Sequence, residues 1–98
     1  MPTFEKLQIF LHDWSRLDPP ERDQFMQAVE KFYDDLVAGQ GFRKSLRVKG
    51  AQGHPGIFEL TWGVGNGRAT FEFGPSVRSG HVHIIWRRIG GHDIFQNP

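Results

Sequence analysis

Several side chains in the second half of the chain could carry out acid–base chemistry on a phosphate group. Glu59, His83 and His92 could accept or donate a proton, and Arg68 and Arg87 could bind a phosphate through their planar guanidinium groups. Cleavage of RNA without a metal needs a base for the 2′-hydroxyl, a cation for the phosphorane and an acid for the leaving 5′-oxygen. The residue types therefore fit metal-independent RNA cleavage.

Charge is distributed unevenly along the chain. Up to Gly39 there are four Lys and Arg against eight Asp and Glu, a net charge of −4; from Gln40 onward there are eight against three, a net charge of +5. A basic half joined to an acidic half predicts a polyanionic partner for one surface. The residues that we expect to hold RNA are Arg43, Lys44, Arg47 and Lys49.

Two other interpretations of these polar residues remain open. Charged residues alternate along any strand with one wet side, so Arg68 and Glu72 could simply pair with neighbours such as Glu59. Alternatively, the pair His81-x-His83 could form a metal site with His92 or Asp93, although the pattern is too short to be specific. Without Cys or a nucleotide-binding glycine loop, we expect no metal and no cofactor.

Two helices are predicted over residues 1–39. Apolar residues recur every three or four positions from Phe4 to Leu17, which predicts an amphipathic helix; a short strand within Thr3–Ile9, with the helix starting near Ile9, is the alternative. Asp18-Pro19-Pro20-Glu21 has the pattern of a capped start for a second helix, which Gly39 ends. The apolar stripe of that second helix consists of Phe25, Val29, Phe32 and Leu36.

Residues 40–98 are predicted to form a basic loop followed by an antiparallel sheet. The strands Ile57–Trp62, Arg68–Phe73 and His81–Arg88 alternate between apolar and polar residues, with a turn at Gly63–Gly67. The expected core residues of the sheet are Phe58, Leu60, Trp62, Ala69, Phe71, Phe73, Val82, Ile84 and Trp86. The expected open face carries Glu59, Thr61, Arg68, Thr70, Glu72, His81, His83 and Arg87. Arg88 is expected at a sheet edge or against the helices, and the fold class is α+β.

Length and composition predict one cytoplasmic domain spanning residues 1–98. A chain of 98 residues with nine Phe and three Trp can bury one core, and it contains no signal-like or membrane-spanning apolar run. We therefore expect no contact with a membrane.

The order of the segments resembles the RelE/ParE superfamily of toxins from bacterial toxin–antitoxin pairs. Asp13-Trp14-Ser15-Arg16-Leu17 is similar to the end of the family's first helix, and Gly56-Ile57-Phe58-Glu59-Leu60 to its glycine-aromatic strand opening. Gly67-Arg68-Ala69-Thr70-Phe71 resembles the segment Tyr-Arg-apolar-x-Tyr, and His81–Phe95 the last strand with its basic, aromatic tail. Order and spacing carry this resemblance more than any single motif.

The resemblance implies a helical hairpin on a small antiparallel sheet, a cognate antitoxin as partner and, in the RelE branch, cleavage of messenger RNA on the ribosome. Arg68 would match the family's phosphate-binding arginine, and Arg87 or Arg88 a second basic position. Phe95 stands where many RelE-like nucleases have a functional Tyr, and His92 could substitute for it. Two alternatives stay open: a ParE-like inhibitor of DNA gyrase, and a non-toxic protein-binding module of the same fold.

Overall fold

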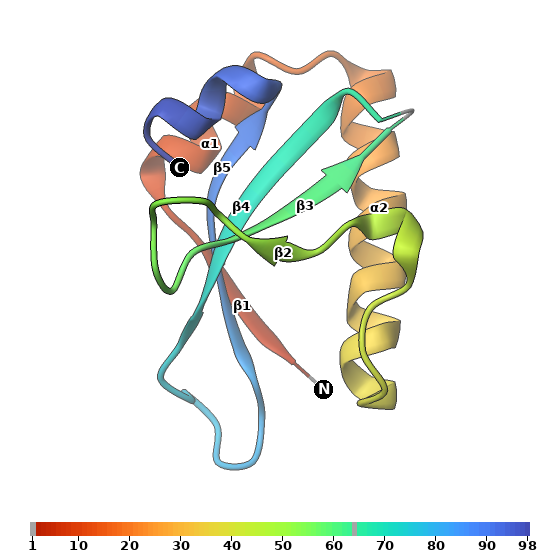
Figure 1. Cartoon of the computed structure of the whole chain (residues 1–98), viewed down its shortest axis with the longest axis vertical. Helices are drawn as coiled ribbons and strands as arrows, with labels where there is room; N and C mark the ends of the chain where they lie inside the picture. The colour runs from red at the N-terminus through yellow and green to blue at the C-terminus, as the bar shows by residue number, and fades with distance from the viewer. Residues whose placement is uncertain (1, 64) are drawn as a thin grey trace.

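The computed structural model describes residues 2–63 and 65–98, which form a five-stranded sheet packed against two helices (Figure 1). The strands are β1 (Thr3–Lys6), β2 (Lys49–Gly50), β3 (Phe58–Trp62), β4 (Gly67–Gly74) and β5 (His83–Gly90), in the order β1-β5-β4-β3-β2. The helices are α1 (Gln8–Ser15) and α2 (Pro19–Ala38), with short 3-10 helices η1 (Lys44–Leu46) and η2 (His92–Gln96). The predicted α+β class is confirmed, and all strand pairs except β1–β5 are antiparallel.

The chain begins with strand β1, so the alternative prediction for its start is confirmed and the helix beginning at Phe4 is wrong. β1 pairs in parallel with β5, and the amides of Thr3 and Leu7 donate to the carbonyls of Val82 and Trp86 at 2.8 and 3.0 Å. Local periodicity cannot reveal this pairing because the partner strand lies at the other end of the sequence.

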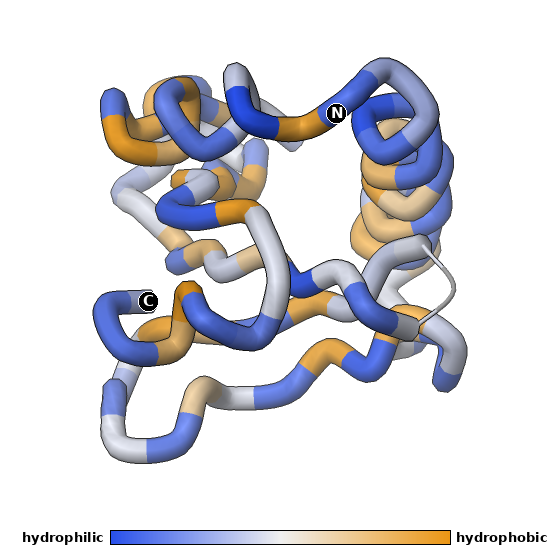
Figure 2. Tube along the Cα trace, turned by 90° about the horizontal axis from the view of Figure 1, so that it is seen from above, coloured by the Kyte–Doolittle hydropathy of each residue, from blue (hydrophilic) through white to orange (hydrophobic). Residues whose placement is uncertain are grey.

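Helix α2 has the predicted boundaries. The Asp18 side chain accepts a hydrogen bond from the Glu21 amide, the Glu21 side chain accepts one from the Asp18 amide, and Gly39 ends the helix with a φ of 70°. Seen nearly along its axis in Figure 2, α2 turns hydrophobic residues toward the sheet and hydrophilic residues outward. No helix in the described part of the chain is long and apolar enough to cross a membrane.

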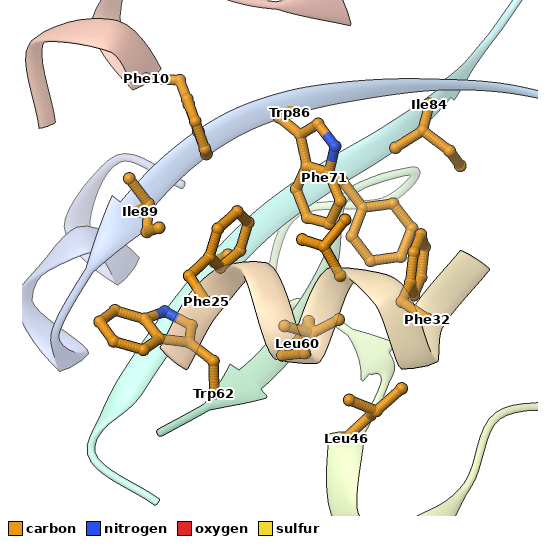
Figure 3. Close-up of a cluster of buried hydrophobic side chains, with 13 residues drawn as sticks. Phe10, Phe25, Phe32, Leu46, Leu60, Trp62, Phe71, Ile84, Trp86 and Ile89 are labelled. Carbon is orange, nitrogen blue, oxygen red and sulfur yellow. The ribbon is translucent and has the colours of Figure 1, made fainter. Parts of the chain in front are cut away.

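The core between α2 and the sheet is built mainly from aromatic rings (Figure 3). Phe25 packs edge-on against Trp62 and Trp86, with ring centroids 6.1 and 5.4 Å apart, and Phe32 packs in the same way on Phe71 at 5.0 Å. Such pairs contribute about 0.5–1.5 kcal/mol each beyond the burial of their surface. These contacts fix α2 across three strands.

Strand β5 contains a bulge at Arg87. In β4, Thr70 pairs with Arg88 while the next residue pairs with Trp86, which leaves Arg87 without a cross-strand partner. One extra residue reverses the alternation of side chains beyond it, so Ile89 enters the core and is 1% exposed. The regular alternation predicted through Arg88 is therefore wrong after Trp86.

The two faces of the sheet differ from the prediction near their ends. Phe73 and Val82, expected in the core, are 48% and 44% exposed, because the β4–β5 hairpin extends past the end of α2 (Figure 1). Thr61, Thr70 and His83, expected on an open face, are all buried. Helix η2 packs against β4 and β5, and β1 supplies the contacts that cover His83.

The connections around β3 are more structured than expected. The predicted loop before β3 contains η1 and β2, and Leu46 of η1 reaches the core. On the other side of β3, the predicted hairpin to β4 is confirmed by the antiparallel pairing that ends at Trp62 and Gly67, while Val64 in its turn lies outside the described residues.

Candidate functional site

A cavity of about 530 Å³ opens between the loop that joins β2 to β3 and the C-terminal segment. The side chains that give it chemical character are Lys49, His54, Glu59, His92, Phe95 and Pro98. Glu59 alternates with core residues of β3, so the cavity lies on the side of the sheet away from α2. The cavity therefore brings together two predicted proton-transfer residues, Glu59 and His92, and one predicted RNA-binding residue, Lys49.

Glu59 and Lys49 are neighbours across the β2–β3 pair. Their Cα atoms are register partners, and the Lys49 Nζ lies 3.7 Å from the Glu59 Oε1. The carboxylate side chain is 12% exposed, whereas the lysine side chain is 69% exposed. The cation is thus accessible to a second anion while the carboxylate is held against the sheet.

His92 and Phe95 belong to η2 and lie on the opposite wall from the strand residues. The imidazole of His92 meets the Phe95 ring edge-on, with centroids 5.0 Å apart. Ile94, between them in sequence, is 3% exposed and anchors the turn to the protein. The exposed His92 side chain can reach solvent and ligand, and Phe95 supplies an apolar wall without a hydroxyl.

His54 is a functional candidate that the sequence analysis did not identify. Its loop is closed by backbone hydrogen bonds: the Ala51 amide donates to the Ile57 carbonyl at 2.8 Å, and the amides of His54 and Ile57 donate to the carbonyls of Ala51 and His54 at 3.1 Å. The signal that could have found it is a single imidazole between Gly53 and the Pro-Gly pair that ends the loop, since short glycine and proline loops present side chains at binding surfaces.

The consecutive residues Arg87 and Arg88 hold the last residues of the chain. The Arg87 Nε donates to the Pro98 carbonyl at 3.3 Å, and its Nη1 lies 3.4 Å from the Glu72 carboxylate. The Arg88 Nη1 donates to the Asn97 carbonyl at 3.0 Å. The bulge lets both guanidinium groups reach this segment, so they support the wall of the cavity that carries His92.

His83 and Arg68 lie away from the cavity. The two ring nitrogens of His83 lie 2.8 Å from the Thr3 hydroxyl and 2.8 Å from the Glu5 carboxylate, at the end of the sheet where it pairs with Gly74. Arg68 lies at the opposite end, where its Nη1 donates to the carbonyls of Gly65 and Gly67 at 2.7 and 3.0 Å. Neither side chain lines the cavity.

The other basic residues lie near η1. Arg43 forms a short ion pair with Asp35 of α2 at 2.8 Å, and hydrogen bonds from the arginine side chain and from its backbone amide lower the pKa of Asp35 to about 2. The same contact raises the pKa of Arg43. Lys44 and Arg47 are exposed, so the segment retains accessible positive charge although Arg43 is neutralised.

The residues of the alternative metal site are not brought together. His83 begins β5, whereas His92 and Asp93 follow its end, so the length of a strand separates them. Within residues 2–63 and 65–98, no group of three His, Asp or Glu side chains is placed to hold a metal ion.

Comparisons with known proteins support the fold. No protein-family model matches the sequence, and neither does a curated protein. A solved structure does match: a chain in the crystal structure of the RelB-RelE antitoxin-toxin complex from Methanococcus jannaschii, with a TM-score of 0.59 and 17% sequence identity over 94% of each chain. The protein therefore has a RelE-like fold, as the resemblance implied.

Proposed function

We propose that this protein is the toxin of a toxin–antitoxin pair and cleaves messenger RNA on the ribosome without a metal. The main support is the cavity, in which a carboxylate, two imidazoles and an accessible lysine meet on one face of a RelE-like fold. These are the groups that cleavage through the RNA 2′-hydroxyl requires. The matched structure is an antitoxin-toxin complex, which supports a cognate antitoxin as the protein partner of this chain. The proposed targets are the ribosome and messenger RNA.

Glu59 is the proposed base and His92 the proposed acid. Glu59 takes the proton of the 2′-hydroxyl, whose oxygen then bonds to the adjacent phosphorus; the bond from phosphorus to the 5′-oxygen breaks, and His92 protonates that oxygen. The products are a 2′,3′-cyclic phosphate and a 5′-hydroxyl. His54 lines the same cavity and is the alternative acid, whereas Phe95 has no proton to exchange.

Lys49 is the proposed cation for the charged phosphorane. It lines the cavity and is largely exposed, whereas Arg68 is engaged with turn carbonyls outside the cavity. Lys44 and Arg47 extend the basic surface toward η1, where they would hold ribosomal RNA. We expect Lys49→Ala to impair cleavage more than Arg68→Ala.

Inducible expression in a bacterial host tests the proposal, with growth and messenger RNA 5′ ends followed together. Wild type should arrest growth and create new 5′ ends, and both effects should be lost in Glu59→Gln and His92→Gln. His12→Gln, an exposed histidine substitution on α1, is the matched control and should behave as wild type.

The other outcomes separate the competing functions. Arrest without new RNA ends, together with loss of supercoiling activity, would indicate a gyrase inhibitor of the same fold. Normal growth at verified expression, with no effect on translation by the purified protein, would indicate a non-toxic protein-binding module.

A further inference from the structure

A second cavity, of about 340 Å³, adjoins the first. It shares His54 and Pro98 with the proposed cleavage cavity and continues toward the junction of β1 and α1. Its other main lining side chains are Leu7, Ile9, Ile57, Arg87, Arg88 and Asn97. The two cavities therefore form one continuous surface, with His54 and Pro98 between them.

The second cavity combines an apolar wall with a cationic side. Leu7, Ile9 and Ile57 supply the apolar wall, and Ile9 is 46% exposed, so its side chain is accessible to a ligand. Arg87 is the more exposed of the two cations: its side chain is 28% exposed, against 19% for Arg88. Its Nε donates to the Pro98 carbonyl at 3.3 Å, and its ion pair with Glu72 is long at 3.4 Å.

Arg88 is paired with Asp13 and therefore contributes less charge to the second cavity. It donates to both carboxylate oxygens of Asp13 at 2.7 and 3.2 Å, which neutralises it. A partly exposed guanidinium beside an apolar surface matches a nucleotide unit, because the phosphate can pair with the cation and the base can pack on the apolar side chains.

We propose that the two cavities bind consecutive nucleotides of one RNA strand. This inference rests on the proposed function and extends it: the nucleotide that reacts occupies the first cavity, and its neighbour places its base against Ile9 and Ile57 and its phosphate beside Arg87. His54 then lies at the junction of the two units, where the bond to be cleaved would pass.

Binding of a 2′-deoxy dinucleotide and of the matching mononucleotide, which both lack the attacking hydroxyl, tests this placement. Titrations followed by NMR should give tighter binding of the dinucleotide and shifts at both cavities. Ile9→Glu should weaken dinucleotide binding by about tenfold, because the apolar contact to the base is lost, and leave mononucleotide binding unchanged. Leu11→Glu is the matched control, because Leu11 is on the same helix, is 44% exposed and lines neither cavity.

The outcomes distinguish this inference from the proposed function. Two results would overturn the two-nucleotide footprint and leave the cleavage cavity intact, provided that NMR shifts are confined to His54 and His92. One is equal affinity for the dinucleotide and the mononucleotide, and the other is an equal loss of dinucleotide binding in Ile9→Glu and Leu11→Glu. No shift at His54 or His92 with either ligand would overturn both proposals.

Discussion

Arg88 on β5 forms a two-point ion pair with Asp13 on α1, its Nε and Nη2 lying 2.7 and 3.2 Å from the two carboxylate oxygens. Asp13 is 6% exposed and also accepts a hydrogen bond from the Ile89 amide at 3.2 Å. The Arg88 Nη1 in turn binds the Asn97 carbonyl. Two residues distant in sequence thus join the first helix, the last strand and the C-terminal segment.

Asp13→Ala should destabilise the protein strongly. The substitution leaves the Arg88 guanidinium, 19% exposed, without its carboxylate, and the penalty for breaking such a buried pair is about 3 kcal/mol. Urea unfolding followed by circular dichroism measures the loss. Asp23→Ala, which removes an exposed carboxylate from α2, is the control and should change stability by less than about 0.5 kcal/mol. Equal midpoints for the two variants would contradict a structural role for the pair.

Two histidines should respond differently to the same substitution. His83→Gln should lower the melting temperature, because the histidine is buried and contacts Thr3 and Glu5 of β1, while leaving the cleavage cavity in place. His92→Gln should keep the melting temperature, because that side chain is exposed, and remove cleavage. Melting curves and RNA cleavage in parallel check this pair; full loss of cleavage in a well-folded His83→Gln protein would return His83 to the candidates for proton transfer.

The Arg43–Asp35 pair predicts a pH dependence. The pKa of Asp35 falls from its ordinary 3.8 to about 2, and the largest cause is the hydrogen bond from the Arg43 side chain. A carboxyl group with a lower pKa in the folded state stabilises the fold above its unfolded pKa and loses that contribution as the pH falls through the folded value. The stability difference between wild type and Arg43→Ala should therefore be constant near neutral pH and shrink between about pH 4 and pH 2.

Urea midpoints measured across that range check the sign of the effect. Lys44→Ala, at an exposed neighbouring cation, is the control and should show no such change. A difference between wild type and Arg43→Ala that persists undiminished at the lowest pH would rule out the ion pair as its cause.

Gly67 should not tolerate a side chain. A Cβ atom at this position would lie 2.2 Å from the Trp62 ring, and Trp62 is fixed by its core contacts and by the hydrogen bond from its Nε1 to the Arg68 carbonyl at 2.9 Å. Gly67→Ala should therefore cost about 1–3 kcal/mol from overpacking, measured as a lower unfolding midpoint. Gly50→Ala is the matched control in β2, where a Cβ meets no atom within 4 Å, and it should be nearly neutral.

Local signals in the sequence were sufficient for much of the fold. The capping box of Asp18 and Glu21, the stop at Gly39 and the β3–β4 hairpin depend on neighbouring residues, and the structure confirms each of them. The RelE-like arrangement, inferred from segment order, is also confirmed. In the candidate site, Glu59, His92 and Lys49 were predicted and lie in one cavity.

The parts that could not be predicted depend on contacts between distant residues. His83 has the sequence pattern of an open-face residue, and only the parallel pairing with β1 buries it. The bulge at Arg87 has no local signature, although it decides where Arg88 and Ile89 point. His54 has one weak local signal, its place in a glycine and proline loop, and only the fold places that loop opposite the C-terminal segment.

Because the tryptophans lie in or against the core and His54 and His92 line the cavities, folding and nucleotide binding should give separate spectroscopic signals. The three tryptophans, Trp14, Trp62 and Trp86, belong to the core or pack against it, and none is among the described residues that line the two adjoining cavities. Their fluorescence should therefore follow unfolding and remain almost constant when a nucleotide binds. The imidazole resonances of His54 and His92 should do the opposite, so one sample can distinguish a variant that no longer folds from one that folds and no longer binds RNA.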